Sequence, residues 1–220
     1  MTTYSLRVRL KSLGGNTSGV ALLEFAFMLP ILLLMSLVGA ELTNYIITRM
    51  RVSQIALHIA DNAARIGSGS QLQAKTINEA DIYDLFEGAN LQSEELDLKA
   101  RGRVILSDVE PMESSTSRYK IGWKRCFGAQ TSYVQKYPGP GDATTNLTGV
   151  GPTGRQAIAP SGGATMFVEV YYKYRPLIET SFSPAPDMVE TAAMMVRDRR
   201  DLVGGNNGVY PVAGLTPLTC

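Results

Sequence analysis

The sequence predicts an α+β protein in which one long N-terminal helix precedes a domain built on a mainly antiparallel sheet. Two observations predict this fold class. First, an apolar run covers residues 20–40, and the segment that follows it, from Glu41 to Ile66, contains no proline or glycine. Second, several short segments beyond residue 67 alternate apolar and polar side chains with a period of two, which is typical of strands. The expected domain at 67–220 is long enough for a core of its own.

The apolar run is long enough to cross a membrane. Residues 20–40 number 21, and a helix of that length spans about 32 Å, against about 30 Å for the hydrocarbon core of a bilayer. The leader, residues 1–19, carries Arg7, Arg9 and Lys11 and no acidic residue. This bias favours a cytoplasmic N-terminus. We therefore expect a cytoplasmic leader at 1–19, a transmembrane helix at 20–40 and an exported remainder.

Glu24 is the only charged residue in the span. A carboxylate there costs about 2.5–3.5 kcal/mol on insertion scales and therefore calls for a partner. A cut after Gly19 would make Val20 the first residue, with an amino group that is largely cationic at neutral pH. We expect this amine to pair with Glu24 of an adjacent copy and so to set the register between subunits. A small residue at the cut, Glu at the fifth position and then an aromatic residue, here Phe25, are typical of a type IV prepilin processing site.

Two other interpretations of the span stay open. In one, the span is a plain signal anchor, and Glu24 snorkels towards the cytoplasmic headgroups. In the other, it is a secretory signal that is cut after Ala40, because Val38 and Ala40 are small residues at the −3 and −1 positions. Against the second, the run is longer than the usual apolar region of about 7–15 residues, and it carries a charge.

Pro30 predicts a kink, because a proline within a helix removes the hydrogen bond to the carbonyl of Ala26. A local opening there would let the helix adapt as subunits leave the membrane and pack; the alternative is an ordinary kink. The extension at 41–66 is amphipathic, and its apolar stripe is expected to dock on the domain. That stripe comprises Val52, Ile55, Ala56, Ile59, Ala60, Ala63 and Ile66. His58 falls on the polar side and is expected to be solvated.

Beyond the long helix, the pattern predicts a short helix at 78–88 and then strands. The expected strands are 103–109, 119–125, 166–174 and, ambiguously between strand and helix, part of 188–201. In the second strand, Tyr119, Ile121 and Trp123 are expected on one face, with Lys120 and Lys124 on the other. The tail at 204–220 is expected to be loop.

The segment 137–163 is rich in glycine and proline and predicts a long flexible loop. Within it, residues 149–156 distantly resemble a phosphate-binding loop. The similarity fails because Arg155 and Gln156 stand where lysine and Ser/Thr are needed, and because no apolar strand precedes the segment. We therefore expect no nucleotide site here.

Composition argues against several functions. The chain has 21 basic and 20 acidic side chains, and cleavage after Gly19 would leave 18 and 20, which speaks against nucleic-acid binding. Two cysteines and one histidine give no metal-ligand spacing. Glu94, Glu95 and Asp97 cluster, but such a cluster is more often a solvated turn than an acid–base pair. We expect no catalytic residues, no metal and no cofactor, and hence not an enzyme.

Cys126 and Cys220 are the two cysteines, 94 positions apart. If the domain is exported, they lie on the oxidising side, and a disulfide between them would fasten the C-terminus. The alternative is two unrelated thiols.

The opening of the span, Gly19–Ala26 followed by Leu29-Pro30, resembles the TadE-like proteins, minor pseudopilins of the tight-adherence (Flp, type IVb) pilus system. Weaker similarity follows at the helix end, in 52–67, and in the domain, in short patterns at 102–107, 121–128 and 167–172. The N-terminal match is the specific part. An exported part of 180 residues is far larger than a major Flp pilin, so the resemblance implies a minor subunit or an assembly factor with a pilin-like fold.

The resemblance implies cleavage between Gly19 and Val20 by a prepilin peptidase and a role for Glu24 in assembly. Implied partners are that peptidase, other pilins or pseudopilins through the N-terminal helix, the inner-membrane pilus assembly machinery and membrane lipid. The implied location is the bacterial inner membrane, with a periplasmic domain that becomes extracellular if the protein enters the pilus used in adherence. The alternatives are a signal-anchored or secreted periplasmic binding protein and an exported enzyme whose site is assembled from distant residues.

Overall fold

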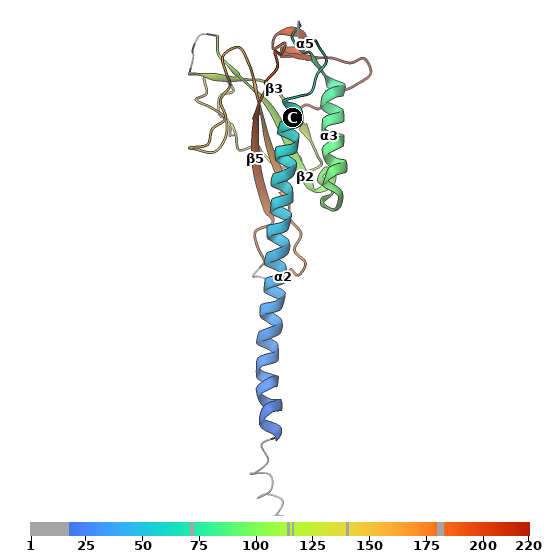
Figure 1. Ribbon diagram of the computed structural model, residues 1–220, viewed down its shortest axis with the longest axis vertical. Coiled ribbons are helices and arrows are strands. Elements are labelled where there is room, and N and C mark those ends of the chain that lie inside the picture. Colours follow the sequence, from blue (N-terminus) through green and yellow to red (C-terminus); the bar gives the residue numbers. More distant parts are fainter. Residues whose placement is uncertain (1–17, 71–72, 114, 116, 140, 180–182) are drawn as a thin grey trace, which may run out of the picture. The chain divides into compact units, whose positions relative to one another are not determined.

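The computed structural model describes residues 18–70, 73–113, 115, 117–139, 141–179 and 183–220 (Figure 1). The chain divides into two compact units. The first comprises Met1–Asn44 and Leu177–Ser183, and the second comprises Tyr45–Pro176 and Pro184–Cys220. The predicted leader lies outside the described residues except for Ser18 and Gly19.

The expected span and its extension form one helix, α2, which runs from Ser18 to Ala63. Every residue from Gly19 to Ala40 is exposed. Among the described residues, α2 is the one helix long and apolar enough to cross a membrane. It ends three residues before the predicted Ile66, because the N–H groups of Arg65 and Ile66 both turn back to the carbonyl of Asn62.

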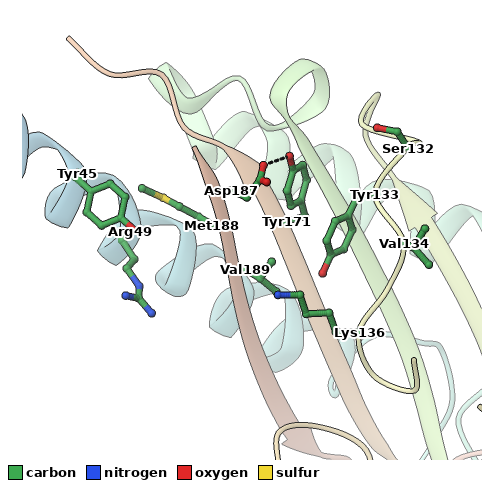
Figure 2. A pocket seen from close by; sticks show the side chains of 10 residues that line it. All are labelled: Tyr45, Arg49, Ser132, Tyr133, Val134, Lys136, Tyr171, Asp187, Met188 and Val189. Carbon is green, nitrogen blue, oxygen red and sulfur yellow. Dashed lines mark hydrogen bonds between the residues drawn. The ribbon is translucent and has the colours of Figure 1, made fainter. Parts of the chain in front are cut away.

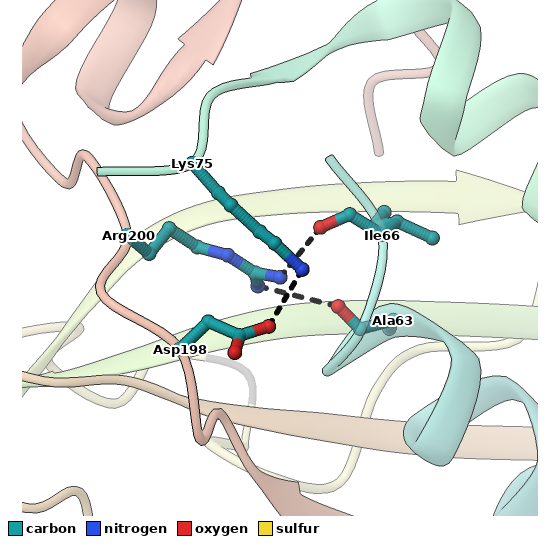
Figure 3. Close-up of polar contacts among 5 residues, drawn as sticks. All are labelled: Ala63, Ile66, Lys75, Asp198 and Arg200. Atoms are coloured by element: carbon teal, nitrogen blue, oxygen red, sulfur yellow. Dashed lines mark hydrogen bonds and ion pairs between the residues drawn. The ribbon is translucent and has the colours of Figure 1, made fainter. Parts of the chain in front are cut away.

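Arg200 satisfies carbonyl groups at the C-terminal end of α2 (Figure 3). Its two terminal nitrogens donate to the carbonyls of Ala63, at 3.2 Å, and Ile66, at 2.9 Å. Carbonyls in the last turn of a helix lack partners within the helix. A cation there also interacts favourably with the partial negative charge at the C-terminal end of the helix dipole. Arg200 thereby fastens this helix end to the segment that contains Asp198 and Arg200. Next to it, Lys75 pairs with Asp198 at 2.7 Å and fastens the chain after the helix to the same segment.

The predicted apolar stripe on the second half of α2 is confirmed. Val52, Ala56, Ile59, Ala60 and Ala63 are at most 1% exposed and belong to the main core. That core lies between this part of α2, a second helix, α3 (Glu79–Ser93), and one face of the four-stranded sheet described below. His58 is exposed, as expected for the polar side.

The second helix, α3, runs from Glu79 to Ser93, five residues beyond the predicted end. Asn78 caps it in a reciprocal arrangement: its side chain accepts from the N–H of Asp81 at 2.9 Å, and Asp81 accepts from the N–H of Asn78 at 3.0 Å. Gly88, where the predicted helix ends, lies inside the observed one. The helix continues through it because packing of an apolar face, which includes Phe86, outweighs one glycine.

Four antiparallel strands form the sheet, in the order β3-β2-β4-β5. Their bounds are Gly102–Pro111 for β2, Tyr119–Phe127 for β3, Thr165–Lys173 for β4 and Asp187–Met195 for β5. The ambiguous segment 188–201 therefore supplies a strand, although only as far as Met195.

The predicted faces of β3 are partly wrong, because the strand contains a bulge. Val109 pairs with Ile121 but Ser107 pairs with Lys124, so two residues of β3 stand opposite Asp108. The extra residue reverses the alternation. Trp123 therefore joins the main core, whereas Tyr119 and Ile121 belong to a second cluster on the other face. For the same reason, Lys120 and Lys124 do not share a face.

The second face of the sheet is covered by the chain between β3 and β4, which includes the predicted loop at 137–163. This segment holds no helix or strand longer than an isolated bridge among its described residues. It packs through Val150 and Ala159 against Phe167 of β4. Buried Glu169 accepts hydrogen bonds from the N–H groups of Lys136, at 2.7 Å, and Tyr137, at 3.1 Å. A carboxylate thus fastens the start of this loop.

Short elements complete the domain. They are β1 at Ile77–Asn78, η1 at Glu94–Leu96, α4 at Leu98–Arg101, α5 at Gly204–Asn207 and β6 at Val209–Tyr210. The last two correct the expectation that the tail is all loop. β6 pairs in parallel with β1, and this pairing buries Ile77 and Val209 completely.

Candidate functional site

The residues predicted for processing and assembly all lie on the first turns of α2. The helix begins at Ser18, so the Gly19–Val20 bond lies in its first turn. Val20 is 62% exposed and Phe25 59% exposed. Val20 and Glu24 are one turn apart on the same face, with a rise of about 6 Å between them. A neighbouring chain displaced by about one turn would therefore bring its amine level with this carboxylate.

Glu24 is exposed, and the structure gives its carboxylate no hydrogen bond or ion pair within the described part of the chain. A charge on so apolar a helix face is costly in a bilayer unless it finds a partner or reaches the headgroups. Pro30 lies inside α2, and the helix continues on both sides of it. The expected opening at Pro30 remains a prediction.

Glu41, the first residue after the apolar run, has a role that the sequence did not indicate. It is only 8% exposed. Its carboxylate accepts hydrogen bonds from the backbone N–H of Leu177, at 2.8 Å, and of Ile178, at 3.4 Å. The partners are more than 130 positions away, so no local pattern could have paired them. This carboxylate holds the loop at 177–183 against the helix.

A cavity of about 520 Å³ lies beside β5 (Figure 2). Its lining residues are Tyr45, Arg49, Ser132, Tyr133, Val134, Lys136, Tyr171, Asp187, Met188 and Val189. Figure 2 shows the rings of Tyr133 and Tyr171 side by side; they stack at 4.3 Å between centroids. The Tyr171 hydroxyl donates to Asp187 at 2.6 Å.

Polar interactions fix the walls of this cavity. Arg49 on α2 pairs with Glu190 on β5 at 2.7 Å. Burial and the hydrogen bond to Asp187 raise the pKa of Tyr171 to about 12, so its phenol stays a donor at neutral pH. The ten lining residues include Ser132 but no histidine that could activate it. The arrangement can bind a polar or aromatic group, and it offers no nucleophile–base pair.

Two buried carboxyl groups lie on the core-facing side of β2. Asp108 is fully buried, and neither of its oxygens has a hydrogen-bond partner within the described residues. Glu110, two residues further along β2, lies on the same face. Its Oε2 atom pairs with Lys120 at 3.0 Å, whereas its Oε1 atom has no hydrogen-bond partner among the described residues. Burial and the neighbouring Glu110 raise the pKa of Asp108 well above its ordinary value, against the opposing attraction of Arg200 and Lys120.

The surroundings of this carboxyl pair are set by the strand opposite β2. Among the residues that the structure describes, no group of three or more histidine, cysteine or acidic side chains could hold a metal ion. Gly122 lies directly against Glu110, and a side chain there would collide with its carboxylate. The bulge of β3 therefore leaves room for these acids, and it does so at a glycine.

The predicted Cys126–Cys220 disulfide is present, with 5.0 Å between the two Cα atoms. It fastens the last residue of the chain to β3. The N–H of Cys126 also donates to the carbonyl of Leu218 at 2.7 Å, so the tail runs along the outer edge of that strand. Both cysteines of the sequence are used in this bond.

Comparisons of the chain with family models, with curated proteins and with solved structures found no match.

Proposed function

We propose that this protein is a minor pseudopilin or pilus-assembly protein of the tight-adherence (type IVb) class, anchored in the bacterial inner membrane by residues 20–40. One observation supports this proposal above all others. A single helix, α2, joins an exposed apolar half, whose one charge is Glu24, to an amphipathic half that is buried in an α+β domain. A helix of this kind serves first as a membrane anchor and then as a packing element between subunits.

The proposed work of the protein is structural. A prepilin peptidase cuts between Gly19 and Val20, and the new amine pairs with Glu24 of an adjacent helix. The helix then packs with other pilins or pseudopilins, and the domain stays on the periplasmic side or is displayed on the pilus. Among the described residues Glu24 has no hydrogen-bond or ion-pair partner, and this supports the role, because a carboxylate surrounded by lipid or apolar helices favours ion pairing.

The N-terminal residue of the protein purified from its native membrane tests the proposed processing. Intact-mass measurement should give a chain that starts at Val20. A chain that starts at Glu41 would mean ordinary signal-peptide removal, and one that starts at Met1 would mean a simple anchor. Either result would remove the amine–carboxylate pairing from the proposal.

Replacement of the carboxylate tests the assembly role. We expect Glu24→Ala to be cleaved and inserted normally but to assemble poorly, as measured by pili per cell and by cross-linking between N-terminal helices. Ser36→Ala is a matched control, since Ser36 is an exposed polar residue of the same helix whose hydroxyl donates to the carbonyl of Leu32, within its own helix. Normal piliation with Glu24→Ala would reject the assembly role.

A further inference from the structure

The loop at 177–183 is fixed to α2 where the apolar run ends. The N–H groups of Leu177 and Ile178 both donate to one oxygen of Glu41. The hydroxyl of Ser183 donates to the carbonyl of Ile178 at 2.9 Å. Helix residues up to 44 and this loop form one compact unit. The loop therefore has a defined height along the helix, level with residue 41.

The loop displays aliphatic side chains at that height. Leu177 is 65% exposed and Ile178 41% exposed, although their backbone N–H groups are used. Leu42, on the helix beside Glu41, is 52% exposed. Single exposed aliphatic residues are common on soluble proteins. Leu42 lies two residues beyond Ala40, where the exposed apolar run ends, and Leu177 and Ile178 are bound to Glu41 between them.

A hydrophobic surface that continues the span points to lipid as its occupant. Residues 20–40 cover about 32 Å, close to the thickness of the hydrocarbon core, so residue 41 falls at the boundary between acyl chains and headgroups. Glu41 tolerates this depth because the loop supplies hydrogen bonds in place of water. Leucine and isoleucine gain free energy when such a boundary removes them from water.

We infer that Leu177 and Ile178 enter the lipid interface at the outer end of the span, so the protein contacts the membrane through a loop as well as through its helix. This inference rests on the proposed membrane anchoring of residues 20–40. Glu41 acts as the positioning residue: it joins the loop to the helix and sets the depth of the two aliphatic side chains. A second contact beside the helix would restrict tilt and rotation of α2 before the subunit leaves the membrane.

Depth measurement on spin labels tests the inference in the full-length protein. Single substitutions Leu177→Cys, Ile178→Cys, Leu34→Cys and Leu91→Cys are labelled with the native disulfide intact and reconstituted in phosphatidylethanolamine–phosphatidylglycerol vesicles. Leu34 marks the middle of the span, and Leu91, a 76% exposed leucine on α3, marks the aqueous domain. Relative accessibility to oxygen and to a water-soluble nickel complex gives the depth of each label.

We expect the labels at 177 and 178 to lie about 5–10 Å into the headgroup and acyl boundary, between the deep label at 34 and the aqueous label at 91. If the labels at 177 and 178 match the label at 91 while 34 is deep, the loop inference is wrong and the anchor stands. If the label at 34 is also aqueous, the proposed anchoring fails, and the loop inference fails with it.

A second variant tests the role of Glu41. Adding Glu41→Ala to the Ile178→Cys protein should move the label at 178 towards the aqueous value. Adding Glu41→Ala to the Leu34→Cys protein should leave the depth of the label at 34 unaltered. A label at 178 that keeps its depth without the Glu41 carboxylate would overturn the role of Glu41 as the positioning residue.

Discussion

The ion pair between Glu79 and Arg125 allows a sharp prediction of stability. Glu79 is the first residue of α3 and Arg125 lies on β3, and their side chains are only 3% and 9% exposed. The guanidinium donates twice to the carboxylate, once from Nε to Oε2 at 2.9 Å and once from Nη2 to Oε1. Arg125 also stacks over Trp123, 5.8 Å from the ring centroid. This pair fastens α3 to the sheet.

Removal of one partner should cost much more than the pair contributes. Glu79→Ala leaves Arg125 charged and buried without its carboxylate, a loss of about 3–5 kcal/mol in the free energy of unfolding. With an m-value of about 2 kcal/mol/M, the urea midpoint should fall by about 1.5–2.5 M. The assay is urea unfolding of the full chain in detergent, followed by fluorescence. Trp123 is the only tryptophan, is 5% exposed and lies beside the pair.

Two controls make the reasoning refutable. Glu95→Ala breaks an exposed pair with Arg51, whose side chains are 81% and 50% exposed, and should cost less than about 1 kcal/mol. The double variant Glu79→Leu with Arg125→Met removes both charges and should be more stable than Glu79→Ala alone. If Glu79→Ala costs no more than Glu95→Ala, or if the double variant is the least stable of the three, the reasoning is wrong: the loss of stability in Glu79→Ala does not come from leaving the Arg125 charge buried and unpaired.

Two further predictions concern the interior and the tail. Stability that a raised Asp108 pKa contributes is complete below its unfolded pKa of about 3.9 and is lost as pH rises through the folded-state value. The urea midpoint of Asp108→Asn should therefore match that of the wild type near pH 4 and exceed it increasingly towards neutral pH. If Asp108→Asn is instead less stable than the wild type at neutral pH, an ionised Asp108 is held by Arg200. Reduction of Cys126–Cys220, which closes a loop of 94 residues, should remove about 4–5 kcal/mol in the chain-entropy account; an unchanged urea midpoint after reduction, with both thiols alkylated, would contradict it.

Local periodicity was sufficient to predict the elements that are regular over many residues. The long helix, the strands β2 and β4 and the buried stripe that includes Val52 and Ile59 follow from spacing alone, because each obeys one period throughout. The pairing of the disulfide was predictable because a chain with two cysteines allows only one intramolecular pair. Leader processing and the role of Glu24 depend on motif resemblance, and they remain proposals.

Prediction failed where tertiary packing overrides a local rule. The bulge of β3 places Trp123 and Ile121 on opposite faces, although strict alternation puts them together. Gly88 lies inside α3 because core contacts continue past it. One signal was available and unused: Asp108 falls in phase with Val104 and Leu106 on β2, so the alternation itself placed a carboxylate on an apolar face.

The carboxylates that hold the loops share one physical logic, and that logic explains why sequence inspection missed them. Glu41 accepts two N–H groups from the loop at 177–183, and Glu169 accepts two from the start of the loop that covers the sheet. A buried carboxylate needs donors, and a loop near an apolar surface has backbone N–H groups that need acceptors, so each contact satisfies both requirements at once. Such a contact orders a loop without regular secondary structure. Its donors are backbone groups that any residue carries, 32 to 137 positions away, so the sequence marks the acceptor alone.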